Sequence, residues 1–519
     1  QKMAAIITDQ IRIVNAKNFL AGIQSATNSY YTFVGLPNPD DFQIDWDTSP
    51  PSPKDCFNDE NEYWDTMLAM KKINSSDVRQ VVVKRVWASG TTYDYYRNDY
   101  TVSNTAKVSG ATNLYNASYY IINSDYRVYE CLQNGTSPDN PNGKPSLDEP
   151  TFTDLEPRSA GSSGDGYIWK YLYTIKPSDI TKFESTDYMP VPQNWESSID
   201  NSAVRGNAID GSIKIVTITD RGVGLGTANR TYTQVPINGD GSGAKATIIV
   251  DNDSQVESIT ISNQGSGYTY GSVDLVSGGV PTGTTRPTFN VIISPEGGHG
   301  ADIYRELGAY NVLLYSRIEN DNENPDFITG NQIARVGVVE NPKEYGSNGI
   351  LNKDKASSVG ALRLSGIGYS TATFTADTYF TQTIATGTTA VGRVVNYDPT
   401  TGVLKYWQDK SMVGFNTVGV AVTEPTYGFK LQEFTSNPIA GGNLTIVPSS
   451  GSNLSINTSF TGLSTVINNR TYYLGQDFVA GVANPEVKKH SGNIIYVDNR
   501  PSITRSSNQK EDIKVVLQF

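Results

Sequence analysis

The sequence predicts a mainly β protein with a few helices (α+β), built as one host domain that two β-rich insertions interrupt. Two features of composition favour this class: the chain has 47 glycines and 25 prolines, and its 31 tyrosines outnumber its 16 phenylalanines and 6 tryptophans together. Turn-forming residues combined with large amphipathic rings are typical of short strands joined by many loops. The third observation is that the composition and residue pattern change along the chain. Its 519 residues are enough to build several cores.

Charge, hydropathy and cysteine content exclude several classes of protein. The formal charge of −12 argues against nucleic acid as a partner, because phosphate binding requires an excess of lysine and arginine on one face. No stretch approaches the roughly 20 apolar residues of a membrane span, and the apolar run before Thr8 is too short for the core of a signal peptide. Cys56 and Cys131 cannot form a disulfide framework, so we expect buried thiols and a soluble protein made in a reducing cytoplasm.

The first host segment, residues 1–205, mixes one helix with several strands. Apolar side chains at helical spacing, after the acidic pair Asp59 and Glu60, predict an amphipathic helix over 61–73. Residues 136–163 are rich in Pro, Asp, Asn and Ser, which indicates a long surface loop. The strands predicted in this segment are 78–87, 119–122 and 126–132.

An internal repeat with a spacing of 43 residues fills the first predicted insertion, residues 206–297. Each copy has the pattern of two alternating strands joined by Gly-rich turns. We therefore expect a small all-β domain of two similar units that pack their apolar faces together. The matching positions are Ile213, Val216, Ile218, Gly222 and Gly224 with Val256, Ile259, Ile261, Gly265 and Gly267, and the run 248–250 with the run 291–293.

The host pattern returns after this repeat and is interrupted once more. Residues 298–355 form the second host segment, in which a short helix over 302–310 and strands over 311–316 and 332–340 are predicted. The second β-rich insertion covers 356–465 and contains a hairpin, with strands 391–395 and 403–407 around the turn 396–402. The last host segment, 466–519, ends on an alternating strand through Ile513, Val515 and Leu517.

Motifs for catalysis, metals and cofactors are missing from the sequence. Gly143-Lys144 is followed by a proline in a loop, so it does not form a phosphate-binding loop. With two histidines in all, His299 and His490, a Ser-His-Asp triad has little to draw on, and no clustered Cys and His predict a zinc site. Residues 239–243 have the composition of a calcium loop without its repeat and are interpreted as a β-turn. We predict no catalytic residue, no metal and no cofactor.

Three groups of residues resemble one known family. They are Gly164–Pro177 (GDGYIWKYLYTIKP) continuing to Pro192, His490–Pro501 (HSGNIIYVDNRP), and Tyr63–Leu68 (YWDTML) with Lys84–Trp87 (KRVW). In these residues the chain is similar to the baseplate wedge subunit of T4-type contractile-tailed bacteriophages, the one that occurs as a homodimer in each wedge. The resembling groups all lie in the host domain and in the family's order, whereas the two insertions have no counterpart in the shorter family members.

This resemblance implies a β-sandwich-based structural protein with added helices. It implies a homodimer that stands in the tail baseplate of the virion beside other wedge proteins, after synthesis and assembly in the cytoplasm of the bacterial host. It implies no catalysis, cofactor or metal. The excess of tyrosine independently favours a protein that works through contacts with other proteins, since Tyr, Trp and Arg are enriched at such contacts.

Nine residues from these groups are candidates for an interface or for defining the fold. A strand after Gly166 would place four aromatic rings on one face and Ile168 and Leu172 on the other. The residues before Pro501 are interpreted as a turn whose arginine, Arg500, could clamp a carboxylate. The full set is Trp64, Trp87, Tyr167, Trp169, Tyr171, Tyr173, Tyr496, Asn499 and Arg500.

Two rival functions stay open. The Gly/Tyr-rich repeat and the aromatic strands favour a carbohydrate-binding or host-adhesion module of a phage tail. A polysaccharide-degrading tail enzyme would instead show clustered acids in a groove. The net charge of −12 indicates that protein partners offer basic patches, so their contacts should weaken with salt.

Overall fold

The computed structural model describes residues 8–38, 45–320, 325, 327–408, 423–424, 428–429, 432–506 and 509–519. These residues confirm the mainly β, α+β class, with 31 short strands and five α-helices among them. The chain divides into two compact units: the first comprises Gln1–Leu20, Val78–Leu314 and Val515–Phe519, and the second comprises Ala21–Asp77 and Tyr315–Lys514. No helix in the described part of the chain is long and apolar enough to cross a membrane. The apolar run before Thr8 lies outside the described residues.

The first unit has a core made largely of tyrosine and tryptophan rings. Strands β4, β5 and β6 form one sheet, and β3 pairs with both β7 and the start of β14. Side chains from both groups of strands meet in a single buried cluster. The elements outside the repeat are α1 (Asp9–Gln24), β3 (Val78–Val83), β4 (Tyr120–Ile122), β5 (Arg127–Asn134), β6 (Tyr167–Thr174), α3 (Pro177–Phe183), β7 (Tyr188–Pro190), α4 (Ser202–Asn207), α5 (Ile303–Leu307) and β14 (Asn311–Glu319).

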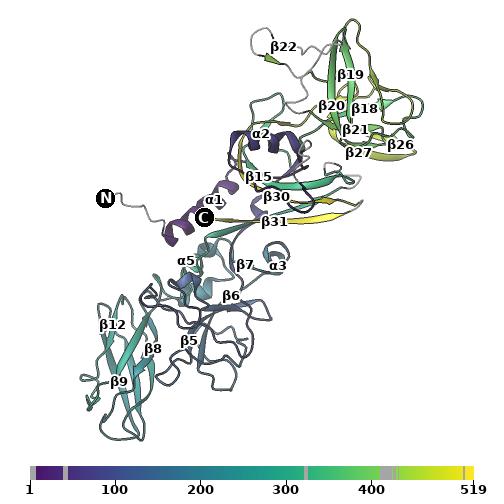
Figure 1. Ribbon diagram of the computed structural model, residues 1–519. Helices are drawn as coiled ribbons and strands as arrows, with labels where there is room; N and C mark the ends of the chain where they lie inside the picture. Colours follow the sequence, from purple (N-terminus) through teal and green to yellow (C-terminus); the bar gives the residue numbers. More distant parts are fainter. Residues whose placement is uncertain are drawn as a thin grey trace. The chain divides into compact units, whose positions relative to one another are not determined.

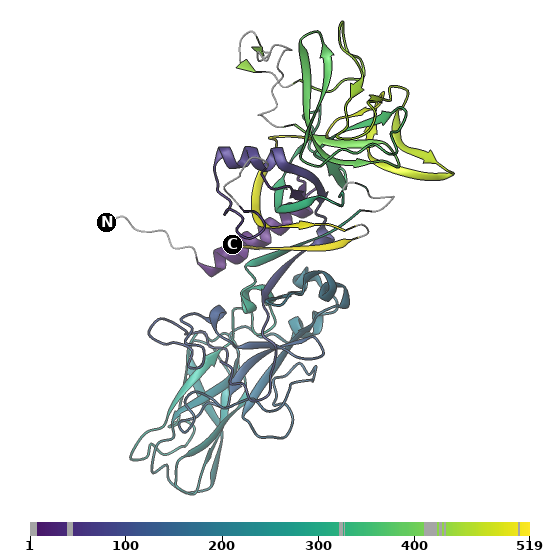
Figure 2. The ribbon, with the colours of Figure 1, turned by 45° about the vertical axis from the view of Figure 1, so that its right-hand side comes forward.

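The repeat forms its own β-rich lobe, in which β8, β9 and β12 lie close together (Figure 1); Figure 2 shows the same teal segment of the chain in a turned view. Each copy has three strands rather than the two predicted. In the first copy the additional strand is β9, whose alternation is broken by Pro236 and a left-handed Gln234 (φ 59°); in the second it is the short β12. The strands are β8 (Ile213–Asp220), β9 (Arg230–Gly239) and β10 (Lys245–Val250) in the first copy, and β11 (Val256–Asn263), β12 (Gly271–Val273) and β13 (Thr288–Ile293) in the second.

The two copies exchange strands instead of only packing face to face. Strand β8 of the first copy pairs with β13 of the second, and β11 of the second pairs with β10 of the first. The pair Val216 and Val291 therefore corresponds to the pair Ile259 and Ile248. Both bulges of one ladder recur in the other: β13 is irregular between Thr288 and Phe289 and between Ile292 and Ile293, and β10 is irregular between Lys245 and Ala246 and between Ile249 and Val250. One core fills the lobe.

The second unit contains a five-stranded sheet of order β17-β2-β1-β15-β30. Here the predicted helix over 61–73 is wrong in its second half, because the helix runs from Phe57 to Thr66 and a strand follows. Met67 and Met70 are fully buried between neighbouring strands, and this tertiary pairing overrides the helical spacing. The elements are β1 (Tyr30–Gly35), α2 (Phe57–Thr66), β2 (Met67–Lys72), β15 (Gln332–Glu340), β16 (Lys343–Glu344), β17 (Lys355–Ser357), β29 (Val487–Lys488), β30 (Asn493–Thr504) and the first part of β31 (Lys510–Gln518), whose residues from Val515 on belong to the first unit.

A second group of strands in this unit surrounds another core, which runs from Leu362 to Ile456. The predicted turn 396–402 joins β20 to β21, as expected. Residues 409–422, 425–427 and 430–431 of the predicted insertion lie outside the described residues, and the boundaries 356–465 stay a prediction. The strands are β18 (Gly360–Ser365), β19 (Tyr379–Ala385), β20 (Thr388–Asp398), β21 (Val403–Trp407), β22 (Thr423–Glu424), β23 (Gly428–Phe429), β24 (Thr445–Ile446), β25 (Leu454–Ile456), β26 (Gly462–Ile467), β27 (Arg470–Phe478) and β28 (Val482–Ala483).

Three further expectations need correction. The strand predicted over 78–87 ends at Val83. The residues around Pro501, predicted to form a turn, continue β30, which runs along β15. Cys56 is exposed rather than buried, because it precedes α2 at the surface, whereas Cys131 is buried as predicted.

Candidate functional site

Four ionisable side chains form a cluster inside the first unit. Glu130 and Lys170 are partners across the β5–β6 ladder, His299 precedes α5, and Glu306 lies on α5. His299 Nδ1 is 2.8 Å from Glu130 Oε2 and 3.0 Å from Glu306 Oε1. All four residues are at most 4% exposed. Within the described ranges, Glu130, His299 and Glu306 are the single group whose donor atoms are close enough to hold a metal ion.

The backbone before α5 is shaped to bring these groups together. Asp302 caps the helix, and its carboxylate accepts hydrogen bonds from two backbone N–H groups of the first turn. The N–H of Gly300 donates to Glu306 Oε2 over 2.6 Å. Gly300 has a φ of +90°, and a Cβ there would lie 2.8 Å from Val204 Cγ1, so glycine satisfies both the conformation and the close packing.

Burial and pairing act in opposite directions on these groups. Burial raises the pKa of Glu130, and the nearby His299 compensates only in part. Burial alone would disfavour the imidazolium, but contact with Glu130 and Glu306 outweighs it and raises the pKa of His299 to about 9. Burial likewise opposes ionisation of Glu306, but hydrogen bonds from His299 and Gly300 outweigh it and lower the pKa of this carboxyl. The directions of these shifts favour the protonated form of Glu130 and the charged forms of His299 and Glu306.

The cluster has donor atoms that metals accept, but its geometry fits a proton better. His299 Nδ1 is hydrogen-bonded to Glu306 Oε1 over 3.0 Å and lies 2.8 Å from Glu130 Oε2, which has no hydrogen-bond partner among the described residues. A divalent ion would have to take the place of that proton at about 2.0–2.2 Å from each donor. The Lys170 ammonium, which donates to the carbonyl of Leu155 over 2.6 Å, adds another positive charge nearby. The cluster therefore acts as a buried link between α5 and the β5–β6 ladder.

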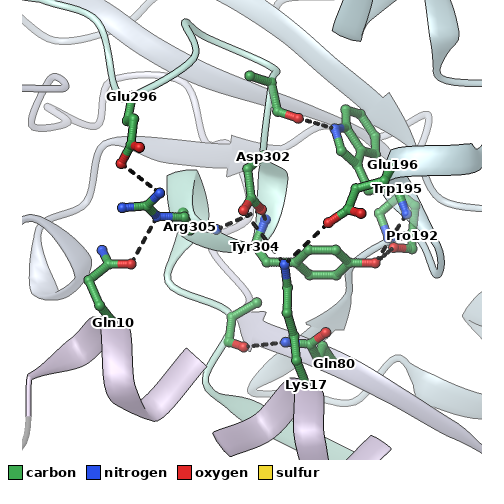
Figure 3. Close-up of polar contacts among 12 residues, drawn as sticks. Gln10, Lys17, Gln80, Pro192, Trp195, Glu196, Glu296, Asp302, Tyr304 and Arg305 are labelled. Carbon is green, nitrogen blue, oxygen red and sulfur yellow. Dashed lines mark hydrogen bonds and ion pairs between the residues drawn. The ribbon is translucent and has the colours of Figure 1, made fainter. Parts of the chain in front are cut away.

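The outer side of α5 carries α1, as Figure 3 shows. Lys17 Nζ lies 3.6 Å from a carboxylate oxygen of Asp302 and 4.7 Å from the ring centre of Tyr304. One turn away, Arg305 Nε donates to Gln10 Oε1 over 3.0 Å. The residue that caps α5 thus also contacts α1, so both helices are fixed by the same short segment.

The segment 300–304 also contacts the residues that follow β7 (Figure 3). The Tyr304 hydroxyl donates to the carbonyl of Pro192 over 2.7 Å. The indole N–H of Trp195 lies 3.0 Å from the carbonyl oxygens of Gly300 and Ala301. Trp195 is fully buried, so its one donor is satisfied inside the core.

The predicted aromatic face of β6 is placed mostly in the core. Tyr167, Trp169 and Tyr173 are fully buried, and Tyr171 is half-buried. Alternation fails because the ladder with β5 has a bulge at Leu172, which is buried together with its neighbour Tyr173. Three of the four rings therefore build the core, and a role in an interface stays a prediction for Tyr171 alone.

Two other candidates, Trp64 and Asn499, lie in the second unit, and Asn499 contacts a buried arginine, Arg335. Trp64 is fully buried beside the five-stranded sheet. Asn499 Oδ1 accepts a hydrogen bond of 2.9 Å from Nε of Arg335. The guanidinium of Arg335 is itself placed over two rings, 4.7 Å from the centre of Tyr63 and 5.4 Å from that of Trp46.

The remaining candidates are nearer the surface. The Trp87 indole N–H donates to Ser146 Oγ over 3.0 Å, with the ring packed on the core of the first unit. Tyr496 is half-buried on β30. Arg500 donates over 2.6 Å to Asp498 of its own strand and its side chain is 62% exposed, which removes the proposed clamp on a distant carboxylate.

Sequence reasoning missed the buried charges. Glu130 and Lys170 each interrupt a short apolar strand, and this is the signal that could have identified them. Nothing in the neighbourhood of His299 or Arg335 marks them as buried, because their partners come from distant parts of the chain.

Comparison with known proteins identifies similarity to one family. The model of the family Phage-Gp8, described as Bacteriophage T4, Gp8, matches residues 5–156. Baseplate wedge protein gp8 of Enterobacteria phage T4 is 25% identical over 222 residues, which cover 39% of this chain and 64% of the relative. The chain thus spans less than two thirds of the length of the curated relative it matches.

Proposed function

We propose that the chain is a structural subunit of the baseplate wedge of a contractile-tailed bacteriophage, acting through protein–protein contacts in tail assembly and contraction. The similarity of residues 5–156 to the T4 Gp8 family carries this proposal. The matched stretch includes α1 and strands β1 to β5, and so contributes to cores in both units. The distant match to a baseplate wedge protein supports the same role.

We further propose that this role requires no catalysis, cofactor or metal. The cluster of Glu130, His299 and Glu306 in the described structure is buried in the core, and His299 and Glu306 are hydrogen-bonded to each other. Both carboxyl groups are buried, so a substrate could reach them only if the surrounding structure opened. This arrangement favours a mechanical role.

Location in the virion is the first test. Purified particles should contain the chain, and antibodies against it should label the baseplate end of the tail in immunogold micrographs. Tails detached from capsids should retain it. Labelling of the capsid, or absence from purified tails, would contradict the proposal.

We also propose a homodimer that contacts other baseplate wedge proteins after assembly in the host cytoplasm. Light scattering of the purified full-length chain should give twice its mass of 56.5 kDa. The same measurement after deletion of residues 206–297 should still give a dimer, since the resembling residues lie in the host segments. A monomer in both cases would refute the dimer without bearing on location in the tail.

A second candidate function, carbohydrate binding, is favoured by one observation in the second unit. A cavity of about 390 Å³ lies beside β20, β21 and β27, and three tyrosines contribute to its wall together with acidic and amide groups. Rings and polar groups of this kind suit a sugar. A glycan array probed with the full chain tests it, with Tyr473→Ala expected to abolish any signal. The relevant lining residues are Asn396, Tyr397, Asp398, Tyr472 and Tyr473.

A further inference from the structure

The outer strand of the five-stranded sheet is covered along one half and open along the other. β30 pairs with β15 on one side, and no other strand of the described residues pairs with its outer side. Over its second half, the Ser502 N–H donates to the carbonyl of Trp46 over 3.2 Å, and Asn499 Nδ2 donates to the carbonyl of Pro51 over 2.9 Å. Pro501 has no N–H to offer. This half of the edge is therefore protected against another strand.

The first half of β30 has no such cover among the described residues. The backbone of residues 493–498 makes no hydrogen bond to any described residue outside its ladder with β15. Ile495 is 39% exposed there. An exposed strand edge is normally blunted in some way, so an open stretch of backbone donors and acceptors marks a place where another strand can pair.

A groove runs along this open half. Its volume is about 450 Å³, and the wall opposite β30 comes from the loop before α2 and from α2 itself. Tyr63 fixes the wall, since its hydroxyl accepts from the N–H of Lys54 over 3.0 Å and donates to the carbonyl of Lys54 over 3.1 Å. We call this the β30 groove; its residues are Pro53, Lys54, Asp55, Cys56, Glu60, Tyr63 and 493–497.

We propose that the β30 groove binds an extended segment of another protein, which adds a strand to β30. A strand edge beside a helix is a known geometry for peptide recognition, in which the backbone supplies the hydrogen bonds and the groove reads alternate side chains. Asp55 and Glu60 outnumber Lys54 among the charged residues of the groove, so the segment carries lysine or arginine at positions facing the wall.

A separate polypeptide segment fits this groove better than a second copy of the chain. A single strand brings only its own backbone. The β30 of a second copy would bring along its neighbour β15 and the loop that covers Ser502, and these would meet the wall formed by the loop before α2. The inference depends on the second unit alone and does not rest on the baseplate role.

Cys56 offers a direct readout, because it lines the groove and is exposed, while Cys131 is buried and serves as internal reference. A display library of random 12-residue peptides would be selected on the purified full-length chain. Selected peptides are expected to alternate apolar and polar residues, to include Lys or Arg, and to slow alkylation of Cys56 about tenfold at saturation. Hydrogen exchange of the amides in 493–497 should slow with the same concentration dependence.

A charge variant and a matched control separate the groove from the rest of the surface. Glu60→Lys should weaken the selected peptides about tenfold, whereas Asp477→Lys, an exposed carboxylate outside the groove, should leave them unchanged. Peptides that bind without protecting Cys56 and the 493–497 amides would overturn the proposal. So would a failure to select any peptide, or protection that appears with protein concentration alone, since the latter would mean that a second copy fills the groove.

Discussion

The two units bury charge in different ways. In the first unit, His299 is held between two carboxyl groups, so an ionised partner neutralises it and the whole cluster can titrate. In the second unit, Arg335 is 1% exposed, and among the described residues Glu62 and Asp59 act on it only from beyond ion-pair distance. Its guanidinium donates instead to oxygens of Asn499, Thr66 and Asn38 and stacks against two aromatic rings.

The two units therefore stabilise a buried charge in two different ways. A buried charge needs compensation for the water that it loses. In the first unit opposite charges supply this compensation, and stability therefore depends on pH. In the second unit hydrogen bonds from neutral groups and aromatic rings supply most of the compensation. Burial lowers the pKa of Arg335 to about 10, so this residue stays charged through neutral pH. Four measurements test this difference between the two units.

The largest expected effect comes from removing one carboxylate of the first cluster. Glu306→Ala leaves a charged His299 and the N–H of Gly300 without their partner, and should cost about 3–5 kcal/mol of unfolding free energy. Urea unfolding of the full chain would measure it, with hydrogen exchange of β5 and β6 locating the loss. Glu296→Ala, whose side chain is 75% exposed, is the control and should change little. A loss below about 1 kcal/mol would mean that the cluster makes no net contribution to holding α5 on the β5–β6 ladder.

The pH dependence of the first unit comes next. The pKa of His299 is raised from 6.5 to about 9, so its contribution is complete below pH 6.5 and is lost as the pH rises through 9. The raised pKa of Glu130 acts in the same direction, and the lowered pKa of Lys170 acts in the opposite one. For one proton the loss is about 1.4 kcal/mol per pH unit, or about 3 kcal/mol across this window.

Hydrogen exchange of β5 and β6 at pH values from 6 to 9, corrected for the intrinsic rate, measures this loss. The same data on β15 and β30 are the comparison, because Arg335 does not titrate in this window. His299→Gln should flatten the profile of β5 and β6. Equal slopes in both units would contradict the distinction drawn between them.

The third effect concerns the fork of hydrogen bonds in the second unit. Arg335→Lys keeps the charge but cannot reach three separate acceptors in one plane, so it should cost about 2–3 kcal/mol. Exchange of β15 and β30 amides reports the loss. Arg500→Lys, on the same sheet but with a side chain 62% exposed, should be neutral. A neutral Arg335→Lys would show that charge alone, without the fork, suffices.

The smallest effect is expected at the junction of α1 with α5. Lys17→Ala removes two long ion pairs, at 3.6 Å and 3.7 Å, and the contact with the Tyr304 ring. We expect a loss of about 0.5–1 kcal/mol, reduced at high salt. The rate of proteolytic cleavage in α1, measured on the full chain, would report this loss of stability. An effect as large as that of Glu306→Ala would mean that α5 is held mainly by its contacts with α1 and not by the buried cluster.

Part of the strand pattern could be predicted, because apolar and polar residues alternate along many strands. The prediction of 332–340 as a strand agrees with β15, and the Asp302 start of a short helix agrees with α5. The 43-residue repeat reappears as equivalent strands with equivalent bulges. The failure over 67–72 has a specific cause: apolar spacing in a short run fits a helix and a fully buried strand equally well.

The class of fold, the 43-residue repeat and some of the strands could be predicted from the sequence alone, since strand patterns depend on neighbours a few residues apart and the repeat is visible as matching residues. The resemblance in residues such as Trp64 and Trp169 also lies in the sequence, as does the similarity over 5–156. Only the tertiary structure decided which charges are buried and what faces them. His299 meets Glu130 because an α5 fixed by its Asp302 cap packs on the β5–β6 ladder, and no local pattern encodes a contact between such distant parts of the chain.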